Sequence, residues 1–221
     1  MDKIKKNLKY FFYKKKSRRK LSQKQKRLLK KNLKEFFFKK QTKNNKKFFL
    51  EIGFGYGDNL LFLAQKNIDK IILGCEVYEP GIANLLDKIN IKKIKNILIY
   101  PENIFSLFEK IKKNSIDKIF ILFPDPWPKK KHHKRRLISP FFINEINKIL
   151  KKEGIIFITT DSKDYLEVIL KNFFLNKNFF WLNKTVKDCY TKFNDINESK
   201  YEQKANFNKN KIFYLKFKKI C

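Results

Sequence analysis

The chain has little cysteine, no long apolar run and few acidic residues. Its three cysteines, Cys75, Cys189 and Cys221, are too few and too scattered for a disulfide framework or a zinc site. That scarcity favours a reducing, cytoplasmic environment. No apolar stretch approaches the roughly 18 residues of a membrane span, so we expect no membrane segment. Residues 1–6 lead into more charge rather than into an apolar segment, so we expect no secretory signal.

Acidic residues are outnumbered by basic ones, with 53 lysines and arginines against 21 aspartates and glutamates and a net charge of +32. Such an excess points to a polyanionic partner, most often nucleic acid and less often an anionic membrane. The abundance of Lys, Asn, Ile and Phe is also typical of AT-rich genes, so part of the charge can be compositional. With 221 residues, 43% of them hydrophobic, the chain is long enough for one domain with a buried core and a short appendage.

The N-terminal region has the pattern of a basic arm followed by a helix. Residues 1–20 are dense in lysine and arginine, and Ser22 and Gln25 have the spacing of a capping box. Apolar residues then recur at helical spacing, which predicts an amphipathic helix over 23–38 with a basic outer face. We therefore expect residues 1–46 to form the arm and helix, and residues 47–221 to form the main domain. A packing role and a role in RNA binding both fit the N-terminal segment.

From residue 48 onward, short apolar runs alternate with helical periods. Strands are expected at 48–52, 71–76, 96–100, 117–123 and 154–160, and helices at 58–66, 80–90, 103–113, 139–152 and 162–175. Runs that are apolar throughout indicate strands buried on both faces, hence a mostly parallel sheet covered by helices. Two further strands, 179–182 and 212–217, flank a polar connection over 183–210 and predict an antiparallel pair at the edge of the sheet. The expected fold class is a doubly wound α/β domain.

A glycine-rich loop follows the first strand, with the sequence EIGFGYG over residues 51–57. In such sheets, ligands bind beyond the carboxyl ends of the strands. Asp58 stands where a dinucleotide fingerprint needs its third glycine, which counts against NAD or FAD. Glu76 closes the second strand, where its carboxylate can accept hydrogen bonds from both hydroxyls of a ribose. An adenosine cofactor without a pyrophosphate, S-adenosylmethionine, fits this pattern better than an ordinary tight turn does.

A proline-rich and basic segment follows the fourth strand, with the sequence FPDPWPKKKHHKRR over residues 123–136. Prolines on both sides of Asp125 stiffen the backbone and remove amide donors. Trp127 can stack on a base, and the cations that follow it can hold phosphates. The simpler alternatives are a turn-forming aspartate and a solvated charged loop. His132 and His133 are adjacent and no cysteine or acidic cluster completes a site, so we expect no metal.

These motifs resemble those of the bacterial tRNA (guanine-N7-)-methyltransferase (TrmB) family. The segments that carry the resemblance are EIGFGYG at 51–57, GCEVYEPGIANLL at 74–86, FPDPWPKKKHHKRRLI at 123–138, TDSKDY at 160–165 and TKFN at 191–194. The resemblance implies a Rossmann-like, S-adenosylmethionine-dependent methyltransferase fold. It also implies that tRNA is the partner and that the guanine at position 46 is methylated. We expect a monomer or a weak homodimer that has no membrane partner.

The resemblance further implies roles for individual residues. The residues it implies for cofactor binding are Glu51, Gly53, Gly55, Gly57, Glu76, Asp125 and the pair Glu102 and Asn103, one of which lies at the adenine. Those implied for substrate binding are Lys129, Asp161, Thr191, Lys192, Phe193 and Asn194. Those implied for RNA contact are Lys131, His132, His133, Lys134, Arg135 and Arg136. The family pattern in the last motif is T-x-F-E followed by a basic residue and a glycine, whereas Asn194 stands here at the acidic position.

Methylation of guanine at N7 needs no proton removed, because N7 already carries a lone pair. The enzyme has to align N7 with the methyl carbon and the sulfur, exclude water and complement the charge. Asp125 is the predicted catalytic residue and holds either the methionine part of the cofactor or the N1/N2 edge of guanine. Asp161 is a second candidate for that edge. The alternative function is a non-catalytic, basic RNA-binding protein that retains the methyltransferase fold.

Overall fold

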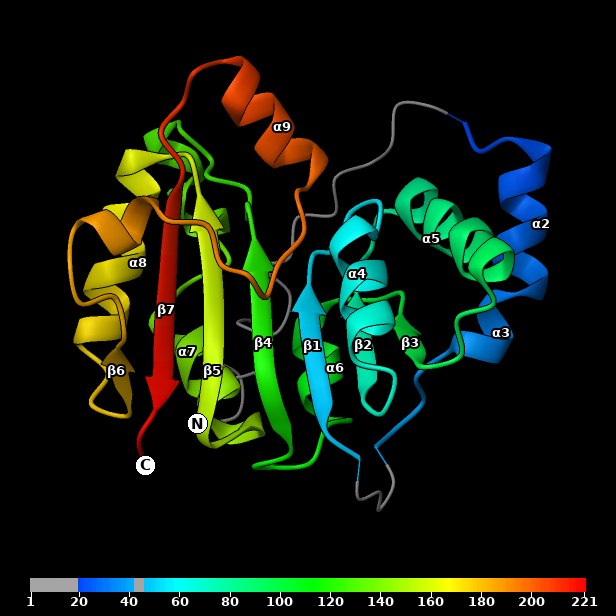
Figure 1. The fold of residues 1–221 in the computed structure, drawn as a ribbon, viewed down its shortest axis with the longest axis horizontal. Helices are drawn as coiled ribbons and strands as arrows, with labels where there is room; N and C mark the ends of the chain where they lie inside the picture. Colours follow the sequence, from blue (N-terminus) through cyan, green and yellow to red (C-terminus); the bar gives the residue numbers. More distant parts are fainter. Residues whose placement is uncertain (1–19, 42–45) are drawn as a thin grey trace.

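The structure is a computed structural model that describes residues 20–41 and 46–221, and a single sheet lies at its centre between two layers of helices (Figure 1). The sheet has seven strands in the order β3-β2-β1-β4-β5-β7-β6. Strands β1 to β5 pair in parallel, and β7 runs antiparallel between β5 and β6. The strands are β1 Phe48–Ile52, β2 Ile71–Cys75, β3 Ile97–Tyr100, β4 Ile116–Leu122, β5 Leu150–Thr160, β6 Phe179–Trp181 and β7 Phe213–Lys219.

Helices cover the two faces of the sheet unequally. As drawn in Figure 1, α4 and α5 lie on the front face of the sheet, with α2 and α3 beside α5 beyond β3, whereas α6, α7 and α8 pack on the opposite face. The α-helices are α2 Gln23–Lys31, α3 Leu33–Phe36, α4 Asp58–Lys66, α5 Glu79–Lys92, α6 Ile104–Phe108, α7 Pro140–Ile149, α8 Lys163–Phe174 and α9 Lys200–Phe207. Two short 3₁₀ helices are η1 Lys130–Arg135 and η2 Lys187–Tyr190.

Alternate residues of each central strand enter two different cores. In β1, Leu50 and Ile52 pack with α6, α7 and α8, while Phe49 packs with α4 and α5 on the other face. Burial on both faces explains why these strands are apolar throughout. The predicted α/β fold with a mostly parallel sheet and an antiparallel pair at its C-terminal edge is therefore confirmed. The main differences in bounds are that α6 ends at Phe108, five residues before the predicted residue 113, and that β5 begins at Leu150, before the predicted residue 154.

The N-terminal helix is shorter than the sequence predicted. The capping box is present, since Ser22 Oγ accepts from the Gln25 amide at 3.2 Å and Gln25 Oε1 accepts from the Ser22 amide at 2.9 Å. The helix predicted over 23–38 is instead divided at Asn32 into α2 and α3. Beyond α3 the chain is extended, because Phe38 donates its amide to the Ile99 carbonyl at the free edge of β3 and buries its ring. Most of the basic arm, residues 1–19, lies outside the described residues.

The connection predicted as polar chain over 183–210 contains a helix that the sequence analysis missed. Ser199 caps α9, with its hydroxyl accepting from the Glu202 amide at 3.1 Å. Only Glu202 and Ala205 of this helix are buried, so its apolar face is too narrow to give a clear helical pattern. In Figure 1, α9 lies above the ends of β4 and β5, beside the edge where the glycine loop emerges.

The carboxyl ends of the parallel strands share one edge of the sheet, shown at the top of Figure 1. The glycine loop leaves this edge after β1, Glu76 follows β2, Asp125 follows β4 and Asp161 follows β5. The fold therefore gathers the predicted site segments at the edge where ligands bind in doubly wound sheets. In the described part of the chain, every helix is too short or too polar to cross a bilayer.

Candidate active site

The glycine loop makes a tight turn whose backbone conformation is unfavourable for residues with a side chain. Gly53, Gly55 and Gly57 all have φ between 55° and 77°, in the left-handed region that favours glycine. Gly57 is the residue from which α4 begins. The start of α5 lies so near that a Cβ built on Gly81 would fall 2.1 Å from the Gly55 carbonyl oxygen. Glycine at position 81 thus lets the loop and α5 approach closely and form one wall of the site.

Glu76 holds the glycine loop against the end of β2. Its Oε2 accepts from the Gly55 amide at 2.8 Å, and its Oε1 accepts from the amides of Val77 and Tyr78 at 2.7 and 2.9 Å. Because a carboxylate has about four acceptor positions, roughly one is left for a ligand. Burial raises the pKa of Glu76 and these amides oppose that effect. The carboxylate can accept one ribose hydroxyl as it stands, and it can take a second only if an amide gives way.

Glu51, at the end of β1, is a buried acid whose charge is poorly compensated. Burial raises the pKa of its carboxyl to about 8; the Asn59 side chain opposes this, and the carboxylates of Glu76 and Asp58 add to it. Its Oε2 is buried and has no hydrogen-bond partner among the described residues. An acid in this position is suited to a cationic ligand, which would favour its ionised form.

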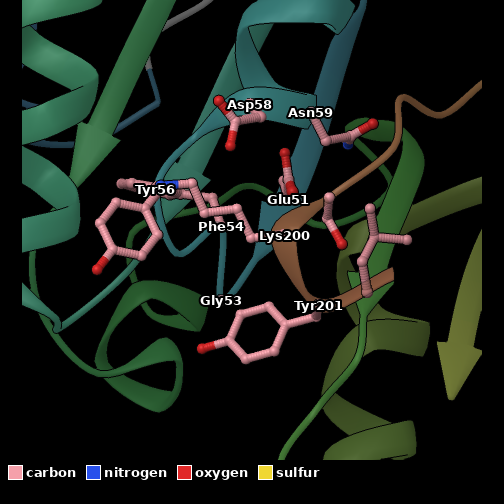
Figure 2. Close-up of a pocket in the computed structure, with 10 residues that line it drawn as sticks. Glu51, Gly53, Phe54, Tyr56, Asp58, Asn59, Lys200 and Tyr201 are labelled. Atoms are coloured by element: carbon pink, nitrogen blue, oxygen red, sulfur yellow. The ribbon is translucent and has the colours of Figure 1, made fainter. Parts of the chain in front are cut away.

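A cleft with an empty volume of about 370 Å³, including the part open to solvent, lies between the glycine loop and the start of α9. Figure 2 shows Lys200 extending toward Tyr56, with Tyr201 beside the loop and Glu51 at its base. The Lys200 Nζ lies 4.2 Å from the centre of the Tyr56 ring. The cleft is lined by Glu51, Gly53, Phe54, Tyr56, Asp58, Asn59, Leu122, Ser199, Lys200 and Tyr201.

The lining residues of α9 were missed by the sequence analysis, although a signal was present. Ser199-Lys200-Tyr201-Glu202 places a hydroxyl, an aromatic ring and an acid at the spacing of the family pattern T-x-F-E, and Lys204 follows as the basic residue. The segment 191–194 matched that pattern in its first three positions and lacked the acid. Of the two segments, only 199–202 contributes residues to the lining of the cleft.

Asp125 stands in the proline-rich loop, close enough to Glu76 and Tyr201 for its charge to act on both. Its side chain is exposed, and its charge adds to the effect of burial in raising the pKa values of Glu76 and Tyr201. Tyr201 in turn lies against the glycine loop, since a Cβ built on Gly55 would be 3.7 Å from its ring. Glu76, Asp125 and Tyr201 therefore influence one another electrostatically at this edge of the sheet, whereas neither Glu76 nor Asp125 is among the residues that line the cleft.

Glu102 and Asn103, the pair predicted at the adenine, have different surroundings. Glu102 is exposed, and its Oε2 accepts from the Tyr100 hydroxyl at 3.0 Å. Asn103 caps α6, because its Oδ1 accepts from the Phe105 amide at 2.8 Å. Both residues have one side-chain oxygen engaged, but Glu102 is the more exposed of the two, and its place at the adenine stays a prediction.

The basic segment that follows Asp125 forms η1 and is mostly exposed. Lys129, Lys131 and Lys134 are exposed and stand at the same edge as the cleft. Two of the predicted RNA-contact residues pack on Trp127. The His132 ring meets it edge-on with centroids 5.7 Å apart, and the Arg135 guanidinium lies 5.0 Å from its ring centre. His133 is half-buried, and the Arg136 side chain is only 3% exposed.

Of the remaining predicted substrate residues, Asp161 lies at the same edge, whereas Phe193 and Asn194 lie over one face of the sheet, away from that edge. Asp161 follows β5 and accepts from Asn210 Nδ2 at 3.1 Å. Lys192 pairs with buried Glu202 at 2.9 Å, and Phe193 packs on Phe157 with ring centroids 5.1 Å apart. The Asn194 carbonyl accepts from Lys66 at 3.0 Å. Thr191 donates its hydroxyl to the Lys187 carbonyl at 3.0 Å, within the same segment. Their part in substrate binding stays a prediction.

The residues present fit S-adenosylmethionine. The buried, unpartnered Oε2 of Glu51 suits a positively charged group, and the open space over Gly53, where a built Cβ meets nothing within 4 Å, leaves room for a ligand against the backbone. Glu76 retains an acceptor position for a ribose hydroxyl. Among residues 20–41 and 46–221, no group of three or more His, Cys, Asp or Glu side chains could hold a metal ion.

Comparisons of the sequence with known proteins point in the same direction. A family profile described as "Putative methyltransferase" matches residues 45–215. The chain is 36% identical over 179 residues to a protein named tRNA (guanine-N(7)-)-methyltransferase from Wolbachia pipientis wMel, covering 78% of this chain and 75% of that one. It is 40% identical over 177 residues to a protein of the same name from Buchnera aphidicola subsp. Schizaphis graminum, covering 80% and 74%.

Solved structures share the fold at low sequence identity. An rRNA methylase from Streptococcus thermophilus aligns with a TM-score of 0.54 and 16% identity, covering 86% of this chain and 92% of that one. A SAM-dependent O-methyltransferase from Thermotoga maritima aligns with a TM-score of 0.51 and 13% identity, covering 94% and 69%. These likenesses establish the architecture of the chain.

Proposed function

This chain belongs to the tRNA (guanine-N(7)-)-methyltransferase family, and we propose on that premise that it transfers a methyl group from S-adenosylmethionine to N7 of the guanine at position 46 of tRNA. The observation that carries the proposal is the convergence of three elements at one edge of the sheet. Glu76 binds the glycine loop through the Gly55 amide, Tyr201 lies against that loop, and the charge of Asp125 acts on both Glu76 and Tyr201. Family membership indicates which reaction the protein catalyses, and this arrangement of residues indicates where in the molecule we propose that it takes place.

The proposed roles follow from the chemistry of the reaction. When bound, S-adenosylmethionine supplies an electrophilic methyl group on a positively charged sulfur. Glu51 would complement positive charge, Glu76 would accept a ribose hydroxyl and Glu102 would lie at the adenine. Asp125 would hold either the methionine part of the cofactor or the guanine edge, with Asp161 as the second candidate for that edge. No residue needs to act as a general base, because guanine N7 carries a free lone pair.

The proposed RNA surface lies beside the cleft. Lys129, Lys131 and Lys134 are exposed and can neutralise phosphates without reading sequence. At the opposite side of the cleft, Ser199, Lys200 and Tyr201 replace the segment 191–194 as our first candidates for contact with the target nucleotide. Their position in the lining supports this assignment. The ring of Tyr201 offers a face on which a base can stack.

Finer properties of the molecule are also proposals. We propose a monomer or a weak homodimer, because copies that each carry a net charge of +32 repel one another. The cytoplasm is the proposed location, since it contains tRNA and keeps thiols such as that of buried Cys75 reduced. We keep residues 1–46 as a proposed arm and helix on a methyltransferase domain of residues 47–221. Phe36 and Phe38 contribute to the cores of that domain.

The proposal is tested by transfer of labelled methyl groups to unmodified tRNA, followed by borohydride reduction and aniline cleavage. We expect label to enter the tRNA and the strand to break at guanine 46, because this chemistry cleaves at N7-methylguanosine. Label at another atom or position would contradict the proposal. A non-catalytic RNA-binding protein would incorporate no label and need not bind S-adenosylmethionine in calorimetry.

Asp125 gives the matched test of the site. Asp125→Ala is expected to abolish methyl transfer while leaving thermal unfolding unchanged, because the side chain is exposed and surface substitutions usually change stability by less than about 0.5 kcal/mol. Asp125→Asn keeps the shape and removes the charge, so it shows whether the charge itself is needed. Near-normal methylation by the alanine variant would refute the assignment.

A further inference from the structure

Arg136 differs from the other cations of the segment that follows Asp125. Lys129, Lys131 and Lys134 are exposed, as a phosphate-binding side chain must be. The Arg136 side chain is 3% exposed and points into the protein at the end of η1. Arginine is rarely buried unless its guanidinium is paired. The contacts it makes therefore indicate what it does.

The Arg136 guanidinium joins two elements that border the site. Its Nε donates to the Pro126 carbonyl at 2.8 Å, and its Nη2 is hydrogen-bonded and ion-paired to the Asp164 carboxylate in the first turn of α8. The same Nη2 lies 3.1 Å from Nε2 of His133. The guanidinium also lies 5.0 Å from the centre of the Tyr165 ring, which is fully buried. Arginine can make these contacts together because its planar group presents several donors in a fixed geometry.

The proline-rich loop has few backbone donors: the Phe123 amide donates to the Thr159 carbonyl at 3.0 Å, and the three prolines that follow have none to offer. Pro124, Pro126 and Pro128 have no amide hydrogen, so the loop can be fixed there only through its carbonyl groups. Phe123 and Trp127 have φ values of 52° and 45°, a left-handed conformation that is unfavourable for residues with a side chain. Such conformations persist where the surrounding structure imposes them. The carbonyl that Arg136 binds belongs to the residue directly after Asp125.

We propose that Arg136 is a positioning residue that fixes the Asp125 loop to α8, and that it does not contact the RNA backbone. The cationic segment then has two functions, with exposed lysines for phosphates and one buried arginine for the geometry of the site. This inference rests on the proposed function and takes the first of the two roles proposed for Asp125, in which its carboxylate holds the methionine part of the cofactor. It departs from the role in RNA contact that family resemblance implied for this residue.

The partner of Arg136 is itself well anchored. Asp164 precedes Tyr165, whose hydroxyl accepts from the Ile138 amide at 3.0 Å in the protein interior. The Arg136 hydrogen bond holds the pKa of Asp164 below its usual value, so the carboxylate is ionised at neutral pH. A series of contacts therefore connects the core to the loop: Tyr165 is anchored in the core, Asp164 is its neighbour in sequence, and Arg136 joins Asp164 to the Pro126 carbonyl, directly after Asp125.

The test measures the two proposed functions of the segment separately in the full-length protein. The dissociation constant of S-adenosylmethionine is measured by calorimetry, and tRNA affinity is measured as a function of salt. For Arg136→Met we expect the dissociation constant to rise about tenfold, the loss typical of a hydrogen bond from a charged group. The slope of log affinity against log salt should stay at the wild-type value, because no phosphate contact is lost.

Lys134→Met is the matched control, since it removes one cation two residues away from an exposed position. It should leave the S-adenosylmethionine dissociation constant unchanged and reduce the salt slope by about 0.7–0.9, the contribution of one phosphate. Arg136→Lys, which keeps the charge without the planar fork, should recover only part of the cofactor affinity. Asp164→Asn should weaken cofactor binding in the same direction as Arg136→Met, and its side chain is 61% exposed, so the variant is expected to fold.

The outcomes separate this inference from the proposed function. If wild-type protein binds both ligands but Arg136→Met reduces the salt slope and leaves cofactor binding unchanged, the residue contacts phosphate and the inference is wrong. If Arg136→Met does not fold, normal cofactor binding by both Arg136→Lys and Asp164→Asn would likewise overturn it. A wild-type protein that bound neither ligand would contradict the proposed function as well.

Discussion

Burial and ligand binding have opposite effects on the ionisation of Glu51: burial favours the neutral acid, whereas a cationic ligand favours the carboxylate. The carboxyl closes β1 inside the protein, and burial raises its pKa to about 8. In the cofactor-free protein it is therefore largely protonated at neutral pH. Between pH 4.5 and 8 the folded state keeps a proton that the unfolded chain has lost, so stability falls as pH rises through this window. A cation bound beside Glu51 would reverse the preference and draw the carboxyl into its ionised form.

Glu51→Gln should make thermal stability less dependent on pH. Glutamine keeps the shape of the neutral acid and cannot ionise. It therefore removes the decrease in the free energy of unfolding, up to about 1.4 kcal/mol per pH unit, that Glu51 causes as pH rises from 4.5 to 8. The melting temperature of the cofactor-free protein is measured from pH 5 to pH 9. We expect it to fall further with rising pH in the wild type than in the variant. Glu153→Gln, at a carboxylate with a 60% exposed side chain, serves as the control and should follow the wild type. Parallel curves for wild type and Glu51→Gln would show that Glu51 ionises normally.

At the scale of elements, the sequence was informative where burial imposed a pattern. β1 and α4 have the predicted bounds, because the strand is apolar throughout and the helix begins directly after Gly57. The end of the N-terminal helical region at Phe36 was not predictable, because Phe37 and Phe38 pair with β3, far along the chain. α9 was missed since only Glu202 and Ala205 are buried, and Ser199, Lys200 and Tyr201 of the cleft lining were missed with it. A helix that buries only two residues has no repeating apolar pattern in its sequence from which it could be predicted.

The contribution of α9 is tested by two tyrosines of similar exposure. Tyr201 is 53% exposed and lies against the glycine loop, whereas Tyr190 is 47% exposed and packs on Phe213. Tyr201→Ala should lower kcat/KM for tRNA methylation at least about tenfold, because a lost stacking contact is worth roughly 1–3 kcal/mol. Tyr190→Ala should stay within a few-fold of the wild type. Equal losses in steady-state kinetics would mean that the cleft residues of α9 have no special role.

At the scale of the whole molecule, the question is whether the net charge of +32 serves RNA binding or reflects composition. Lysines occur on every side of the protein, including the edge opposite the site. Lys112 and Lys113 precede β4 and Lys152 lies near the start of β5, and all three are exposed. They carry the same charge as Lys129, Lys131 and Lys134 but stand at the amino ends of the strands. If the charge serves RNA binding, the lysines at the carboxyl ends of the strands should contribute to tRNA affinity more than those at the amino ends.

Two triple substitutions to methionine decide between these possibilities. Replacing Lys129, Lys131 and Lys134 should reduce the salt slope of tRNA binding by about 2–3, at 0.7–0.9 for each phosphate contact. Replacing Lys112, Lys113 and Lys152 should leave the slope close to that of the wild type. Affinity measured by fluorescence anisotropy between 50 and 200 mM salt, about the range over which such slopes are determined, checks both. A slope that is flat in the wild type, or equal reductions in the two variants, would mean that the charge is compositional.

The central claim is that one space, bordered by the glycine loop, Glu76 and Asp125, binds the cofactor. The most direct measurement is a crystal structure of the protein with S-adenosylhomocysteine, the product left after methyl transfer. We predict that its ribose lies within hydrogen-bonding distance of Glu76 and that its sulfur faces the region between Asp125 and Tyr201. A ligand bound at any other edge of the sheet, or crystals that take up none at saturating concentration, would contradict the account.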